Sequence, residues 1–384
     1  MQIKKAIKLR AYPGRAQSEL LNRHFGSARF IYNYFLAYKT EQYKITGKSA
    51  SYVEMSKELT RLKTIEEYAW LNEISRKSLE HSLANLDFAF NSFFRKLSKY
   101  PKFKSKYRSK QSFSIGSPHC SIKSDGIHLP LIGVVKCDIS NLPDNYKLFS
   151  ATVSRNPSGK IFISLSIQID IPDPVVDVSK PIIGLDFGLK TFITTSDGVK
   201  YEHPKPNKKH QLKLAREQRA LARKQNTSKR RFKQKLKTAR VYERISNIRQ
   251  DFLHKLSRKL VGENQAIYVE DLNLEGMKSK FGKSVSDLGW AEFVRQLTYK
   301  GLWCGCEIKK IDRFFPSSKT CSKCGWIKQD LSLEDRIWEC PVCLTKHDRD
   351  INAAINVLEY GRADRNLRTG REDQLLDELC NSKE

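Results

Sequence analysis

Four of the nine cysteines stand in two pairs, each with two residues between its members, and fifteen residues separate the pairs. Thiolates in this spacing form two knuckles that close around a tetrahedral Zn²⁺ ion and leave no coordination position open for catalysis. Cys304 and Cys306 precede the first pair, and we expect them to be buried thiols rather than ligands. The sequence therefore predicts one structural zinc ion, held by Cys321, Cys324, Cys340 and Cys343.

Three acidic residues stand at positions where a charged side chain is unusual or could serve a function. Asp186 lies inside an apolar run, Glu270 closes another, and Asp350 directly precedes a predicted helix. Taken singly, each could be a turn residue, a salt-bridge partner or a helix N-cap. Carboxylates that converge repel one another unless cations neutralise them. Together the three could hold two Mg²⁺ or Mn²⁺ ions for phosphoryl transfer.

Two neighbouring acids are expected to lie outside that group. Strand alternation turns Asp271 to the opposite face from Glu270. Asp348 lies two residues before Asp350, in the loop that leads to the helix.

The net charge and the apolar content of the chain indicate what kind of molecule it binds and which classes of protein it does not belong to. The 384 residues carry a formal net charge of +28, which predicts a polyanionic partner, above all nucleic acid. A hydrophobic content of 39% excludes a disordered polymer. No apolar run approaches the roughly 18 residues of a membrane span. The basic N-terminal stretch lacks an apolar segment, so we expect no signal peptide.

Two segments concentrate the positive charge. Between Arg95 and Lys110 there are eight basic residues with interleaved aromatic residues and no acid, and between Lys205 and Lys259 there are twenty basic residues and three acids. The first could be a solvated linker, but we favour phosphate contact and base stacking. The second predicts a basic hairpin of two helices that binds a duplex or a structured RNA. The expected contacts are Lys102, Lys104, Arg230, Arg231, Lys233 and Lys235.

The period of the apolar residues indicates the elements that must position these side chains. A strand over 1–11 precedes a helix from about 17, and a second helix over 75–97 carries an apolar stripe that we expect to be buried up to Phe94 and Leu97. Short strands follow over 111–172, and strands at Asp186 and Glu270 flank the basic hairpin. The remaining expected elements are a helix over 288–303, a strand over 307–311 and a helix over 351–360.

The motifs around the three acids resemble the RuvC segments of TnpB, a family of RNA-guided DNA endonucleases encoded by insertion sequences. The zinc cluster between the second and third acids, and the stretch Gly26–Asn33, are similar to the same family. All three acidic and all four cysteine positions are filled, which favours an active enzyme. The matching motifs are Gly184–Gly188, Val269–Leu272, Phe315–Cys321 and His347–Ala354.

The resemblance implies an α/β multidomain fold: an RNase H-like RuvC nuclease domain with an inserted zinc ribbon, a helical recognition part and a β-barrel wedge domain. The implied boundaries are 1–12 and 99–178 for the wedge, 13–98 for the helical part, 179–320 and 344–375 for the nuclease domain with its basic hairpin over 205–260, 321–343 for the zinc ribbon, and 376–384 for a flexible tail.

The resemblance also implies a mechanism. A guide RNA from the transposon end would select double-stranded DNA beside a short target-adjacent motif. One site of Asp186, Glu270 and Asp350 would cut both strands with two Mg²⁺ or Mn²⁺ ions. Tyr52, Arg76 and Lys77 would face the motif-bearing duplex. The protein would act as a monomer within the ribonucleoprotein, in the prokaryotic cytoplasm at the nucleoid.

Two other functions share much of this evidence. A zinc-ribbon nucleic-acid-binding regulator that does not cut would have no need for the three acids. A compact type V CRISPR effector would share every residue argument, and only its RNA or its neighbouring genes would distinguish it.

Overall fold

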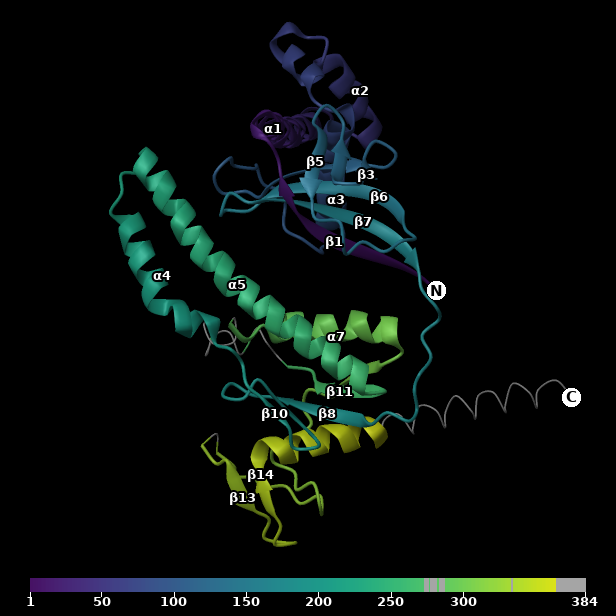
Figure 1. Ribbon diagram of the computed structural model, residues 1–384, viewed down its shortest axis with the longest axis vertical. Coiled ribbons are helices and arrows are strands. Elements are labelled where there is room, and N and C mark those ends of the chain that lie inside the picture. The colour runs from purple at the N-terminus through teal and green to yellow at the C-terminus, as the bar shows by residue number, and fades with distance from the viewer. Residues whose placement is uncertain (273–275, 277–281, 283–286, 333, 364–384) are drawn as a thin grey trace, which may run out of the picture. The chain divides into compact units, whose positions relative to one another are not determined.

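The computed structural model describes residues 1–272, 276, 282, 287–332 and 334–363 (Figure 1). The chain divides into two compact units, Met1–Pro172 and Asp173–Glu384. The division falls six residues before the boundary expected at 178. The expected tail 376–384, and the end of the expected nuclease segment at 364–375, lie outside the described residues.

The first unit contains a seven-stranded sheet in the order β2-β6-β7-β1-β5-β4-β3. Its first strand, β1, runs antiparallel to β7 along almost its whole length, with Gln2 opposite Asp170 and Ala11 opposite Ile161. The N-terminal strand therefore completes a sheet formed mainly by residues beyond 110, a pairing that the family resemblance implies and that the period of the sequence alone does not. The strands are β1 (Gln2–Tyr12), β2 (Gln111–Gly116), β3 (Ser121–Lys123), β4 (Gly126–Leu129), β5 (Gly133–Cys137), β6 (Lys147–Arg155) and β7 (Ile161–Asp170).

The helices of the first unit share a second core. Apolar side chains of α1 and α3, such as Phe35 and Leu83, pack together with no exposed surface. The expected burial of Phe94 and Leu97 is wrong: their side chains are 64% and 77% exposed, because α3 ends at Phe94 and the chain leaves the helical period there. The elements are α1 (Arg15–Thr46), α2 (Tyr52–Leu62), the 3₁₀ helix η1 (Glu66–Glu73) and α3 (Arg76–Phe94).

The second unit is built on a five-stranded mixed sheet in the order β10-β9-β8-β11-β12. The strands β8, β11 and β12 run parallel, whereas β9 and β10 continue from β8 as an antiparallel meander. The strands are β8 (Ile182–Phe187), β9 (Ile193–Thr195), β10 (Lys200–Tyr201), β11 (Ala266–Glu270) and β12 (Glu307–Ile311).

Helices cover both faces of this sheet (Figure 1). The hairpin of α4 (Pro206–Ala222) and α5 (Lys229–Glu263) breaks where the sequence predicts it. The end of α5 packs with α7 (Trp290–Cys304) on one face, against Ile183, Leu185, Ile267 and Val269. A helix over 349–363 packs on the other face, against Ala266 and Tyr268. Among the described residues, no helix has the length and apolar character needed to cross a membrane.

The helix over 349–363 lies very close to the sheet. A Cβ atom added at Gly184 would stand 2.2 Å from the carbonyl oxygen of Ala354, and one added at Gly361 would stand 2.2 Å from the ring of Tyr268. Only glycine permits these approaches, because neither the backbone nor a buried ring can yield by more than an ångström. The two glycines therefore fix where the helix crosses β8 and β11.

Candidate metal centres

The register of the sheet brings Asp186 and Glu270 together. The pairing of the parallel strands β8 and β11 ends at Leu185 with Val269, so the next residues along, Asp186 and Glu270, are neighbours. Strand alternation places both on the face that carries Gly184 and Tyr268. This is the face covered by the helix over 349–363.

The same helix brings Asp350 to that face from its first turn. Burial raises the pKa of Asp186 well above its usual range, and the nearby charges of Glu270 and Asp350 raise it further. Arg349 and Arg336 oppose this shift. Asp186 therefore lies close enough to Glu270 and Asp350 for their charges to act on it, which makes the three acids a candidate cation site.

Each of the other two acids has a partner within the second unit. Burial raises the pKa of Glu270, and the buried hydroxyl of Ser317 donates a hydrogen bond to its Oε1, which lowers it. Asp350 forms an ion pair with Arg336, whose Nη1 lies 3.3 Å from Oδ1. Sequence reasoning did not single out Ser317, although it stands in the Phe315–Cys321 motif.

The two neighbouring acids have structural roles. Asp271 forms ion pairs with Lys310 and Arg313, whereas its neighbour Glu270 bonds to Ser317. Asp348 lies at the end of a strand rather than in a loop, and its Oδ1 accepts the amide hydrogens of residues 350 and 351 at 3.1 and 3.2 Å. Asp348 is thus the N-cap of the helix. Asp350 does not fill that capping role.

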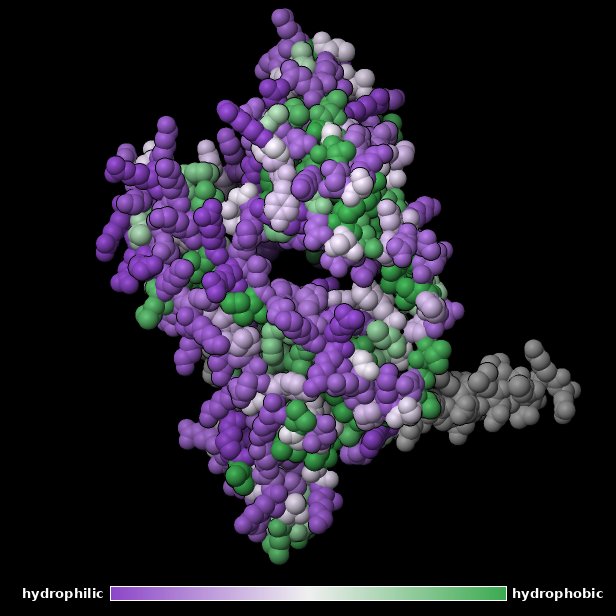
Figure 2. Space-filling model, in the orientation of Figure 1, coloured by the Kyte–Doolittle hydropathy of each residue, from purple (hydrophilic) through white to green (hydrophobic). Residues whose placement is uncertain are grey.

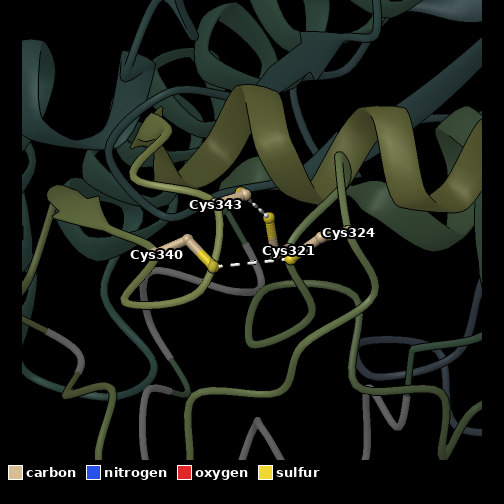
Figure 3. A group of neighbouring side chains, drawn as sticks. All are labelled: Cys321, Cys324, Cys340 and Cys343. Atoms are coloured by element: carbon tan, nitrogen blue, oxygen red, sulfur yellow. Dashed lines mark hydrogen bonds between the residues drawn. The ribbon is translucent and has the colours of Figure 1, made fainter.

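The four predicted cysteines meet at one point (Figure 3). Their sulfur atoms all lie within 4.8 Å of one another. The second knuckle lies in the hairpin of β13 (Ile337–Glu339) and β14 (Lys346–Asp348), and hydrogen bonds from Thr345 lower the pKa of Cys343 to about 6. Four sulfur donors at this spacing suit a tetrahedral Zn²⁺ ion.

Of Cys304 and Cys306, both expected to be buried thiols, only Cys306 is buried. Burial raises the pKa of the Cys306 thiol to about 12, so it remains an inert buried thiol. Cys304, however, is exposed, because it closes α7 just before Gly305 turns the chain into a left-handed conformation. Neither residue joins the four-cysteine cluster.

The expected contacts with a target duplex remain predictions. Tyr52 is exposed at the first position of α2. Arg76 and Lys77 both form ion pairs with Glu80, at 2.8 and 2.7 Å. The Arg76 and Lys77 side chains reach solvent while Glu80 is largely covered, so a phosphate contact would have to compete with Glu80 for these cations.

The basic run over 95–110 presents one of its two named lysines to solvent. Lys102 is exposed, as are the neighbouring rings of Phe103 and Tyr107. Lys104 instead turns inward: its Nζ lies 3.6 Å from the ring centroid of Tyr32, and burial lowers its pKa. The structure favours Lys102 over Lys104 as a phosphate contact.

Figure 2 shows strongly hydrophilic side chains gathered over the helical hairpin, and most of its lysine and arginine residues are exposed. Arg231 closes the hairpin by donating to the carbonyl oxygens of Leu221 and Lys224, at 2.7 and 3.1 Å, and is therefore structural rather than a free contact. The other three named residues of α5 are exposed. Helical spacing also defines a single exposed stripe of five cations: Arg230, Lys233, Lys237, Arg240 and Arg244.

Three family models match this chain. A model described as a probable transposase, OrfB_IS605, matches residues 166–280. A model for the Cas12f1-like TNB domain matches residues 290–357, which contain the four cysteines. A helix-turn-helix model of the same OrfB_IS605 group matches residues 1–48.

Curated relatives span nearly the whole chain. A protein of Streptomyces pristinaespiralis named "Putative RNA-guided DNA endonuclease" is 38% identical, over 94% of this chain and 90% of that protein. The "Putative RNA-guided DNA endonuclease InsQ" of Escherichia coli K12 is 31% identical, over 93% and 92%. A "TnpB-like protein" of Acanthamoeba polyphaga mimivirus is 29% identical over half of this chain.

Solved structures share the fold at low identity. A chain from a cryo-EM structure of a Cas12f1-sgRNA-target DNA complex matches 93% of this chain with a TM-score of 0.57 and 15% identity. The mini-RNA-guided endonuclease Cas_phi3 matches 94% with a TM-score of 0.51 and 8% identity. Fold and site thus define a class of protein: a two-unit α/β protein with three neighbouring acids and a cluster of four cysteines. Its relatives confirm the resemblance: the chain belongs to the TnpB family of OrfB_IS605 proteins.

Proposed function

We propose that this protein is an RNA-guided endonuclease of double-stranded DNA with a single active site, formed by Asp186, Glu270 and Asp350. The observation that carries the proposal is the electrostatic group of these acids on one face of the second sheet. It occurs in a chain whose relatives, matched over more than nine-tenths of its length, are named for this activity.

The donor set suits hard divalent cations. The three groups offer carboxylate oxygens, which Mg²⁺ and Mn²⁺ prefer. Two such ions, when bound, would activate water and stabilise the leaving oxygen of a phosphodiester. The protein's own contribution is to hold the buried carboxylate of Asp186 and the partly buried carboxylate of Glu270 on adjacent strands, where mutual repulsion disfavours their charged forms without a cation.

The second unit serves as the RuvC-like nuclease domain in this proposal. Its sheet places acids on the two neighbouring parallel strands β8 and β11, and residues 321–343 form an inserted zinc ribbon. The first unit combines the wedge, from β1 and the strands of 111–170, with the helical recognition part between them. Because the substrate is DNA, the reaction takes place at the nucleoid.

The exposed stripe of α5 is the proposed phosphate contact for the guide RNA. Binding should weaken with salt with a slope of about −0.7 to −0.9 per phosphate neutralised. Changing Lys233, Lys237 and Arg240 to glutamate should weaken binding to unrelated RNA sequences alike and reduce the slope by about two to three units. Filter binding over a range of salt concentrations measures both quantities.

A control variant with the same change in net charge shows whether the effect comes from lost phosphate contacts or from the lower net charge alone. Lys123, Lys136 and Lys346 are exposed on other elements, and their change to glutamate should leave the slope close to that of the wild type. Equal slopes for the wild type and the hairpin variant would place the phosphate contacts elsewhere.

The bound RNA tests the proposal against its alternatives. Sequencing of the RNA that co-purifies with the protein should yield one dominant species from a transposon end. An RNA from a CRISPR array would identify a compact type V effector. Absence of a defined RNA, with tight binding to a fixed DNA site and no cutting, would identify a regulator and overturn the proposal.

A further inference from the structure

A short segment joins the two candidate metal centres. Residues 316–322, which we call the bridge segment, begin beside Glu270 and end in the first cysteine knuckle. At its start, the hydroxyl of Ser317 donates a hydrogen bond to Oε1 of Glu270. Ser317 is only 5% exposed, so water does not compete freely for that carboxylate oxygen.

The helix over 349–363 clamps the bridge segment with two buried asparagines. Asn356 Nδ2 donates to the carbonyl oxygens of Ser317 and Thr320, at 2.7 and 2.6 Å. Asn352 Nδ2 donates to the same Thr320 oxygen at 2.7 Å, and its Oδ1 accepts the amide hydrogen of Ser322 at 2.9 Å. Ser317 is therefore fixed relative to the helix that carries Asp350.

The turn does not need the Ser317 hydroxyl for its own integrity. Thr320 closes the turn, because its amide and its hydroxyl both donate to the carbonyl oxygen of Pro316, at 3.0 and 2.9 Å. Asn356 uses the Ser317 carbonyl and not its side chain. Glu270 is the one hydrogen-bond partner of the Ser317 hydroxyl among the described residues.

We propose that Ser317 is a positioning residue for the carboxylate metal centre: its hydroxyl holds Oε1 of Glu270 and so orients the carboxylate toward a divalent cation shared with Asp186. This inference rests on the proposed function for the identity of the centre. A glutamate has three rotatable bonds, and a ligand oriented by an outer hydrogen bond binds metal about 10- to 100-fold more tightly than one without it.

Two adjacent serines provide a matched test. Ser318 follows directly in the bridge segment, and its hydroxyl makes no hydrogen bond among the described residues. Mn²⁺ binding to Ser317→Ala, Ser318→Ala and the wild type is measured by the loss of the free-ion electron paramagnetic resonance signal. The binding of interest is the fraction that Asp186→Ala removes.

Ser317→Ala should raise the Mn²⁺ dissociation constant by about tenfold, while Ser318→Ala should match the wild type. Zinc content and guide RNA affinity should stay unchanged in both variants. The Mg²⁺ concentration for half-maximal DNA cutting should rise by a similar factor, with the rate at saturating Mg²⁺ close to that of the wild type. Asn356→Ala, which frees the whole bridge segment, should weaken both Mn²⁺ and zinc binding.

Equal Mn²⁺ affinity in Ser317→Ala and Ser318→Ala would overturn the inference, whether or not the protein cuts DNA. Loss of zinc from Ser317→Ala would also overturn it, because the hydroxyl would then be part of the structural turn. Weaker Mn²⁺ binding in a protein that cuts no DNA would support the role of Ser317 and refute the proposed function.

Discussion

Asp186→Ala is expected to abolish cutting of both DNA strands while leaving guide and target binding nearly intact. The side chain is buried on the sheet, and the charges of the other two acids act on it, so its loss removes a proposed cation ligand and no exposed nucleic-acid contact. A metal centre contributes several kcal/mol to transition-state stabilisation, so each strand should be cut slower by about three orders of magnitude or more. Strand-specific end labels on one duplex report both rates.

Asp271→Asn is the matched control for that variant. Asp271 follows Glu270 in the chain but pairs with Lys310 and Arg313, so its change should cost little activity. If Asp186→Ala still nicked one strand at the wild-type rate, a second nuclease centre would have to exist, and the assignment of a single site would be wrong.

Cys324→Ser is expected to lower the zinc content from about one ion per chain to near zero and to unfold the ribbon. The ribbon's core is small, built mainly from the cysteines with Trp326, Leu331 and Trp338, so metal binding must supply much of its folding free energy. Because the first knuckle continues the bridge segment, cutting should also fall. Metal analysis and limited proteolysis between residues 321 and 343 measure the change.

Cys304→Ser controls for the loss of a thiol. Cys304 is exposed and lies outside the cluster, so this variant should retain its zinc and its resistance to protease. A Cys324→Ser protein with a full complement of zinc, or a ribbon that resists protease without it, would contradict a structural role for the metal.

Local patterns in the sequence predict several features well. The cysteine spacing identifies all four members of the sulfur cluster, because two short knuckles need no long-range information. The helical period identifies both arms of the hairpin and the break at residues 226–228. Alternation along β11 separates Glu270 from Asp271, since the two must face opposite sides of one strand.

Contacts between distant segments could not be predicted in this way. The bond between Ser317 and Glu270 joins residues 47 positions apart, and a buried serine has no distinctive spacing in the sequence. Lys104 lies outside any helix, and its inward orientation depends on a contact with Tyr32 in the distant helix α1. The exposure of Phe94 and Cys304 depends on where a helix ends, which periodicity places only to within a few residues.

Exchange of the guide RNA tests the central claim most directly. The protein is assembled with either of two guides of unrelated sequence and incubated with Mg²⁺ and both matching duplexes, each carrying the same flanking sequence. Each complex should cut only the duplex that matches its guide, and exchanging the guides should exchange the target. Cutting that ignores the guide, or no cutting of either duplex by a complex that retains its RNA and zinc, would contradict the account.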